Sequence, residues 1–93
     1  MQESEREITA KPRADLAVEY IDDDLLVLDK KHGQIHQLNH TACVVWKGIA
    51  AGDSWRTIVS SLVDQYEVSA DTAGKDIERL VSQFRILNLL ESQ

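Results

Sequence analysis

The stretch of residues 34–46 constrains the fold most, because its hydrophobic period changes half-way along. In the first half, Gln34–Leu38, the side chain of Ile35 points one way and those of His36 and Leu38 point the other, which predicts a strand. Apolar residues then return at helical spacing, which predicts one face of a helix: Ala42, Val45, Trp46 and Ile49. A strand therefore runs directly into a helix.

Asn39 stands at this junction, where its side chain is able to accept a hydrogen bond from the free N–H groups of the first helical turn. Leu38 before it and Cys43 after it are placed to pack together as a hydrophobic staple, which fixes the angle between strand and helix. We expect a rigid corner here, with strands before it and helices after it.

Three short strands are expected before the corner. Residues 16–21 alternate, residues 25–28 form an apolar run flanked by aspartates, and Gln34–Leu38 is the third strand. The apolar run is typical of a central strand covered on both faces. Both linking segments are short and polar, and the second ends in Gly33, which adopts a positive φ easily. The pattern predicts an antiparallel meander with the third strand at an edge.

Three helices are expected after the corner. The first covers His40–Ala51, Ser54 and Ser69 are placed to cap the second and third, and Asn88 is suited to end the third in a left-handed conformation. This order predicts an α+β domain that is winged-helix-turn-helix-like, with a three-stranded antiparallel sheet followed by three helices.

The length of 93 residues allows one domain. Residues 1–15 are polar, contain the only proline and show no period, so we expect a flexible N-terminal arm before a domain of residues 16–93. The net charge of -6 argues against nucleic acid and against an anionic membrane as partners. The charged start lacks the apolar core of a secretory signal, and a single cysteine permits no internal disulfide, which favours the cytoplasm.

Catalytic and metal-binding patterns are weak. His32, His36 and His40 are spaced by four residues, but they fall on a predicted turn, strand and helix start rather than on one helical face. Cys43 lies near a helix N-terminus, which lowers a thiol pKa, but also beside the apolar face, where cysteine packs as a core residue. A small metal- or thiol-dependent enzyme is therefore the weakest hypothesis, and we predict no catalytic residue, no metal and no enzyme activity.

A binding surface is the stronger prediction. The third strand carries no lysine, proline or bulge that would protect a sheet edge, which favours the addition of an extended peptide. A short strand, or one covered by the N-terminal arm, fits the residues equally well. On the third predicted helix a polar flank borders a partly exposed leucine, whereas Lys75, Glu78, Ser82 and Arg85 lie on the outer side. The candidate peptide-binding residues are Gln34, Ile35, His36, Gln37, Leu38, Asp76, Arg79, Leu80 and Gln83.

Several short motifs occur in an order and spacing that resemble the PqqD family, over residues 16–91. They are Leu38-Asn39, Thr41-Ala42, Trp46, Ser54, Tyr66-Glu67-Val68 and Asp76-Ile77. The family usually ends its last helix with Gly-Leu-Leu or Gly-Leu-Ile, whereas this chain has Asn88-Leu89-Leu90. Asparagine tolerates the left-handed conformation, so the helix end is preserved.

The resemblance implies a RiPP recognition element, that is, a non-catalytic chaperone that binds the leader of a ribosomally synthesised precursor peptide. In the family the leader adds as a strand beside the third strand and lies against the third helix. The domain then presents the peptide to a modifying enzyme, often a radical S-adenosylmethionine (SAM) protein that holds the iron–sulfur clusters itself, so no cofactor is expected here. Pyrroloquinoline quinone (PQQ) biosynthesis, lasso-peptide maturation and other pathways all remain open.

The alternative is a DNA-binding winged-helix transcriptional regulator, since a similar helical pair occurs there. Its recognition helix would expose Lys75, Arg79 and Arg85 beside Asp71, Asp76 and Glu78. That leaves little net positive charge for phosphate groups.

Overall fold

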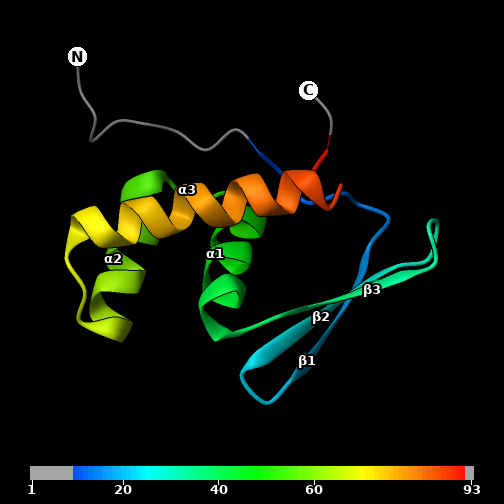
Figure 1. Cartoon of the computed structure of the whole chain (residues 1–93), viewed down its shortest axis with the longest axis horizontal. Helices are drawn as coiled ribbons and strands as arrows, with labels where there is room; N and C mark the ends of the chain where they lie inside the picture. The colour runs from blue at the N-terminus through cyan, green and yellow to red at the C-terminus, as the bar shows by residue number, and fades with distance from the viewer. Residues whose placement is uncertain (1–9, 92–93) are drawn as a thin grey trace.

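Three strands and then three helices follow one another in the computed structural model, which describes residues 10–91 (Figure 1). The predicted fold class is therefore confirmed. The elements are β1 (Ala17–Ile21), β2 (Asp24–Asp29), β3 (Gln34–Leu38), α1 (His40–Ala51), α2 (Trp55–Tyr66) and α3 (Ala70–Ile86).

The strands form one antiparallel sheet in the order β1-β2-β3, so β3 lies at an edge as predicted. Ile21 pairs with Asp24 across a tight turn, in which Asp22 takes a positive φ of 56°. Gly33 takes a φ of 65° in the second turn, a conformation that is free of strain for glycine. Short turns of this kind set the register of both hairpins.

One face of the sheet is buried and the other is not. Leu25 and Val27 of β2 are fully buried, whereas Leu26 and Leu28, which point the opposite way, are only half-buried. On that second face Ile35 is 67% exposed. The prediction that the central strand is covered on both faces is therefore wrong for the described residues, because all the helices lie on one side of the sheet (Figure 1).

The corner between β3 and α1 has the predicted cap. The Asn39 side chain accepts a hydrogen bond of 3.0 Å from the backbone N–H of Ala42, while its own backbone remains extended. Leu38 and Cys43 on either side are both buried, as the hydrophobic staple requires. The direction of β3 is thus fixed relative to α1.

The other helix ends also follow from local chemistry. The hydroxyl groups of Ser54 and Ser69 accept hydrogen bonds from Thr57 N and Thr72 N, which caps α2 and α3. Asn88 follows α3 with a φ of 63°, so the predicted left-handed helix end is confirmed. No helix within residues 10–91 has the length and apolar character needed to cross a bilayer.

Helix α1 lies at the centre of the molecule and packs against the sheet, α2 and α3. Trp46 of α1 meets Phe84 of α3 edge-to-face, with 5.4 Å between the ring centroids. Gly48 lets α2 approach closely, because a Cβ there would lie only 2.6 Å from Ile58 Cγ1. The sheet and α3 are therefore both held on α1.

The described part of the N-terminal segment packs onto the domain. Ala10 is buried, Pro12 forms a β-bridge with Leu90, and Arg13 N donates to Leu89 O at 3.0 Å. Residues 10–15, which were expected to belong to the arm, thus pack beside the segment that follows α3, and Ala10 joins the core. The remainder of the predicted arm, residues 1–9, lies outside the described residues.

Candidate functional site

A hollow of about 420 Å³ lies between the end of β3, the start of α1 and one side of α3. The corner at Asn39 borders this hollow, because the chain turns there from β3 into α1. Helix α3 crosses α1 and closes the other side (Figure 1). The lining residues are Gln37, Leu38, Asn39, Thr41, Ala42, Asp76, Arg79, Leu80, Gln83, Phe84 and Leu87.

The first wall is the β3 edge, whose outer backbone groups face no other described strand. Alternate side chains of β3 divide between the two faces of the sheet. Leu38 is buried and His36 half-buried on the helix side, whereas Ile35 points to the opposite face. The Nε2 atom of His36 is buried and has no hydrogen-bond partner among the described residues. The edge is therefore open, and the side chains on its helix side lean toward the core.

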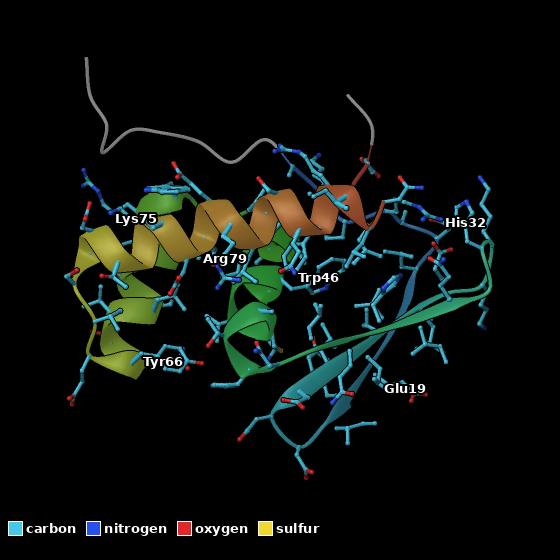
Figure 2. All side chains as sticks on the ribbon, viewed as in Figure 1. Glu19, His32, Trp46, Tyr66, Lys75 and Arg79 are labelled. Atoms are coloured by element: carbon cyan, nitrogen blue, oxygen red, sulfur yellow. The ribbon has the colours of Figure 1, made fainter. Side chains whose placement is uncertain are left out.

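The second wall is a polar flank of α3. Figure 2 shows Arg79 on the side of α3 that looks toward the sheet, and its guanidinium lies 3.6 Å from the Asp76 carboxylate. Gln83 follows along the same flank. Leu80, which was expected to be a partly exposed floor, is only 5% exposed, because α3 packs it against the core. Along this wall an acidic, a basic and an amide side chain thus follow one another, beside an apolar base formed by Leu80.

The hollow brings together most of the predicted site residues: Gln37, Leu38, Asp76, Arg79, Leu80 and Gln83. Gln34, Ile35 and His36 belong to the same edge but lie outside the hollow. Sequence reasoning missed Asn39, Thr41, Ala42, Phe84 and Leu87 as lining residues. The corner motif placed the first three at a strand-to-helix turn, and that turn was the signal available for them.

The three histidines do not form a metal site. His32 contacts Asp29, with Nδ1 2.8 Å from Oδ2, while His40 lies 3.2 Å from the side-chain oxygen of Gln65. Among residues 10–91 no three histidine, cysteine, aspartate or glutamate side chains are close enough to share a metal ion. The separation arises because the histidines lie on a turn, a strand and a helix.

Burial raises the pKa of the Cys43 thiol. Its side chain lies in the core, so the cost of removing a thiolate from water exceeds the opposing effect of the Lys47 charge, and the carboxylates of Asp24 and Asp23 act in the same direction as burial. The local chemistry therefore favours a packing role for this residue over a nucleophilic one.

Helix α3 is poorly suited to DNA. The Lys75 ammonium lies 3.6 Å from the Asp71 carboxylate, and Arg79 is paired with Asp76. Two of the three cations that a recognition helix would offer to phosphate groups thus have an acidic neighbour. The regulator hypothesis is not favoured.

Comparisons with known proteins agree with this geometry. The family model described as "Coenzyme PQQ synthesis protein D (PqqD)" matches residues 24–90, which covers most of the chain. The chain belongs to the PqqD family. A comparison with curated protein sequences gives no significant match.

Two solved structures share the fold of this PqqD-family chain. One is described as "Lasso peptide synthetase B1 complexed with the leader peptide", with a TM-score of 0.82 and 26% identity over 91% of this chain and 100% of that one. The other is "TbiB1 in Complex with the TbiA(beta) Leader Peptide", with a TM-score of 0.80 and 22% identity over 89% of this chain and 96% of that one. Both similar structures are thus complexes with a leader peptide.

Proposed function

We propose that this PqqD-family domain binds the leader of a ribosomally synthesised precursor peptide by strand addition at β3. The observation that carries the proposal is the open edge of β3 facing a hollow whose other wall is α3. An added strand would bond to the free backbone groups of β3, which gives affinity with little dependence on sequence. The leader complexes of the two similar structures support this choice of ligand.

Specificity would come from the side chains that the added strand directs toward the helices. Those side chains would enter the hollow, where Leu38 and Leu80 offer apolar contact and Gln83 offers hydrogen bonds. Asp76 and Arg79 supply one charge of each sign, so the flank suits polar or charged leader residues at matching positions. Proline, lysine and other features that protect a sheet edge from pairing are absent from β3, as the addition of a peptide strand requires.

The domain would act without catalysis of its own and hand the peptide to a modifying enzyme. The similar structure described as a lasso peptide synthetase B1 supports a biosynthetic partner of this general kind. We propose a modifying enzyme as the second partner, with a radical SAM protein as one candidate class, and no cofactor in this chain. A short precursor gene and a modifying-enzyme gene beside the gene for this chain would identify both partners.

Backbone amide shifts during titration test the proposal. The probes are a synthetic leader of the precursor encoded nearest this gene and, in parallel, the TbiA(beta) leader. Shifts should concentrate at Gln34–Leu38 and along residues 76–83. A duplex DNA titration is the matched alternative, and shifts confined to Lys75, Arg79 and Arg85 with DNA would contradict leader binding.

A further inference from the structure

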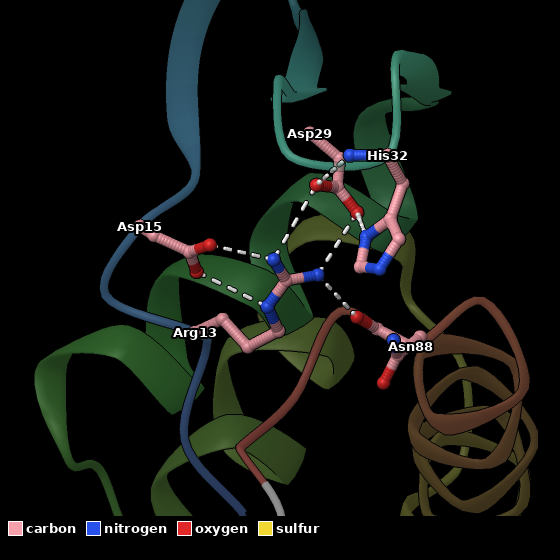
Figure 3. Close-up of polar contacts among 5 residues, drawn as sticks. All are labelled: Arg13, Asp15, Asp29, His32 and Asn88. Carbon is pink, nitrogen blue, oxygen red and sulfur yellow. Dashed lines mark hydrogen bonds and ion pairs between the residues drawn. The ribbon is translucent and has the colours of Figure 1, made fainter.

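The side chain of Arg13 joins the sheet to the end of α3 (Figure 3). Its Nη1 donates to Asp29 Oδ2 and to the backbone carbonyl of Asn88, both at 2.9 Å. Its Nη2 donates to the other Asp29 oxygen at 3.3 Å and to Asp15 Oδ2 at 2.7 Å, and Nε donates to Asp15 Oδ1 at 3.1 Å. A guanidinium has five N–H donors, and these bonds use all of them.

The groove is the hollow together with the open edge of β3. The Arg13 bridge joins β2, the strand beside β3, to the segment that follows α3. No Cα atom of α3 lies within 8 Å of a Cα atom of any strand, because α1 separates the helix from the sheet. The sheet and α3 are each packed on α1, which fixes them at the Leu38 end of β3. Their separation at the far end depends on what bridges them there.

Arg13 lies at that far end. Asp29 of β2 is the register partner of Gln34, the first residue of β3, and Asn88 lies two residues beyond Ile86, the last residue of α3. The Arg13 backbone is itself anchored to the segment after α3, since Arg13 N donates to Leu89 O at 3.0 Å and Glu91 N donates to Lys11 O at 2.7 Å. The side chain therefore reaches from the α3 side of the molecule to the sheet.

Asp29 gives this bridge its strength, because its side chain is only 1% exposed. The hydrogen bonds from Arg13, opposed by burial and aided by His32, hold the pKa of the Asp29 carboxyl well below its usual range. The carboxylate also accepts hydrogen bonds from His32, whose backbone N lies 3.2 Å from Oδ1. A buried anion is strongly disfavoured without a partner, so the bridge resists opening at neutral pH.

We propose that Arg13 is a positioning residue of the groove, which sets the separation between β3 and the end of α3 and so the geometry in which a leader strand is received. The planar fork of arginine suits this role, because it satisfies a carboxylate and a carbonyl at the same time, which the compact ammonium of lysine cannot do in the same geometry. The inference rests on the function proposed above for the identity of the ligand, whereas the bridge itself is a property of the free protein.

The distance across the groove is the direct test. Spin labels at Ile35→Cys and Ser82→Cys, in a Cys43→Ala background, report the separation of β3 and α3 without any ligand. Arg13→Ala is expected to lengthen and broaden the distance distribution. Asp29→Asn is nearly isosteric, leaves no buried anion and provides a second variant should Arg13→Ala unfold. Ile58→Val, a buried change on α2 away from the hollow, controls for lost stability and should leave the distribution unchanged.

Leader affinity supplies the second readout. Arg13→Ala should weaken leader binding about tenfold, a typical size for coupling between distant sites, while Ile58→Val should change it by less than about twofold. An unchanged distance distribution in both bridge variants, or equal broadening in Ile58→Val, would overturn the proposal. If the wild-type protein binds neither probe leader, the proposed function fails, and the ligand-free distances still decide the role of Arg13.

Discussion

The two outer strands of the sheet occupy equivalent places but differ in what faces them. Glu19 of β1 and Gln37 of β3 both pair with Leu26 of β2, so the two edges are mirror positions around one central strand. Each edge leaves a row of backbone groups without a described partner strand. By backbone chemistry alone, either edge would accept an added strand.

Among residues 10–91, the hollow gives β3 a second wall. Across from it lie the hollow and the polar flank of α3, whereas the helix side of β1 meets the Lys47 ammonium, which lies 4.8 Å from the ring centroid of Tyr20. Figure 2 shows Glu19 on the strands at a distance from α3. By this comparison, an open edge would supply affinity on either side of the sheet, whereas selection of one peptide would require a facing element that contacts its side chains.

Removal of the support behind α3 should have the largest effect. Trp46→Ala should reduce the free energy of unfolding by about 3–5 kcal/mol, because this buried ring holds Phe84 of α3 against α1. Urea denaturation measures the loss. Tyr20→Ala on β1 is the comparison, since Tyr20 is 56% exposed and should cost less than about 1 kcal/mol. Equal losses would mean that α3 is not held through Trp46.

Proline pairs on the two edges test where the leader adds. Adjacent residues of a strand point their N–H groups to opposite sides, so one of His36→Pro and Gln37→Pro removes a donor that faces the groove. That variant should weaken leader binding about five- to tenfold, because it loses one hydrogen bond to the leader and its proline ring hinders the approach of the leader backbone. The other variant should mainly reduce the stability of the sheet.

The matched pair on β1 is Val18→Pro and Glu19→Pro, since these residues hold the same register positions on the other edge. Leader affinity, measured by calorimetry on variants that remain folded, should change by less than about twofold for both. A β1 proline that weakens binding as much as a β3 proline would place the leader on the wrong edge for our proposal.

The local chemistry of the chain was enough to predict the fold and the elements that border the hollow. The change of period at Asn39, the two serine caps and the polar linkers each act over a few residues, so the elements could be predicted from their own segments. The register of alternating side chains on β3 correctly separated Ile35 from His36 and Leu38.

Contacts between distant segments could not be predicted in the same way. Arg13 contacts Asp29 at a sequence separation of 16 residues and Asn88 at a separation of 75, and no spacing pattern in the sequence predicts such partners. Residues 10–15 looked like part of an arm because they are polar and contain a proline, although they close the core. The uncovered face of β2 was missed for the opposite reason, since an apolar run reads the same whether one or both faces are covered.

Charge on the second wall should have a moderate effect. Arg79→Glu and Asp76→Lys should each weaken leader binding about two- to fivefold without unfolding the domain, because exposed charges contribute up to about 1 kcal/mol. Lys75→Glu is the matched control, since Lys75 also pairs with a neighbouring aspartate at 3.6 Å but lies outside the hollow. Titration calorimetry of the three variants with one leader separates the hollow from the outer side of α3. A loss for Lys75→Glu as large as that for Arg79→Glu would move the contact to the outer side.

The smallest effect on binding is expected at the corner where β3 becomes α1, a feature that β1 lacks. Cys43→Ser places a hydroxyl group in a buried apolar site and should cost about 1–2 kcal/mol of stability. Leader affinity should stay within about twofold of the wild type, because Cys43 is absent from the lining of the hollow.

The raised pKa of the Cys43 thiol further predicts slow alkylation of the folded protein at neutral pH, since burial disfavours the reactive thiolate. Loss of leader binding in a folded Cys43→Ser protein, or rapid alkylation that abolishes binding at unchanged stability, would show that the thiol itself takes part in function.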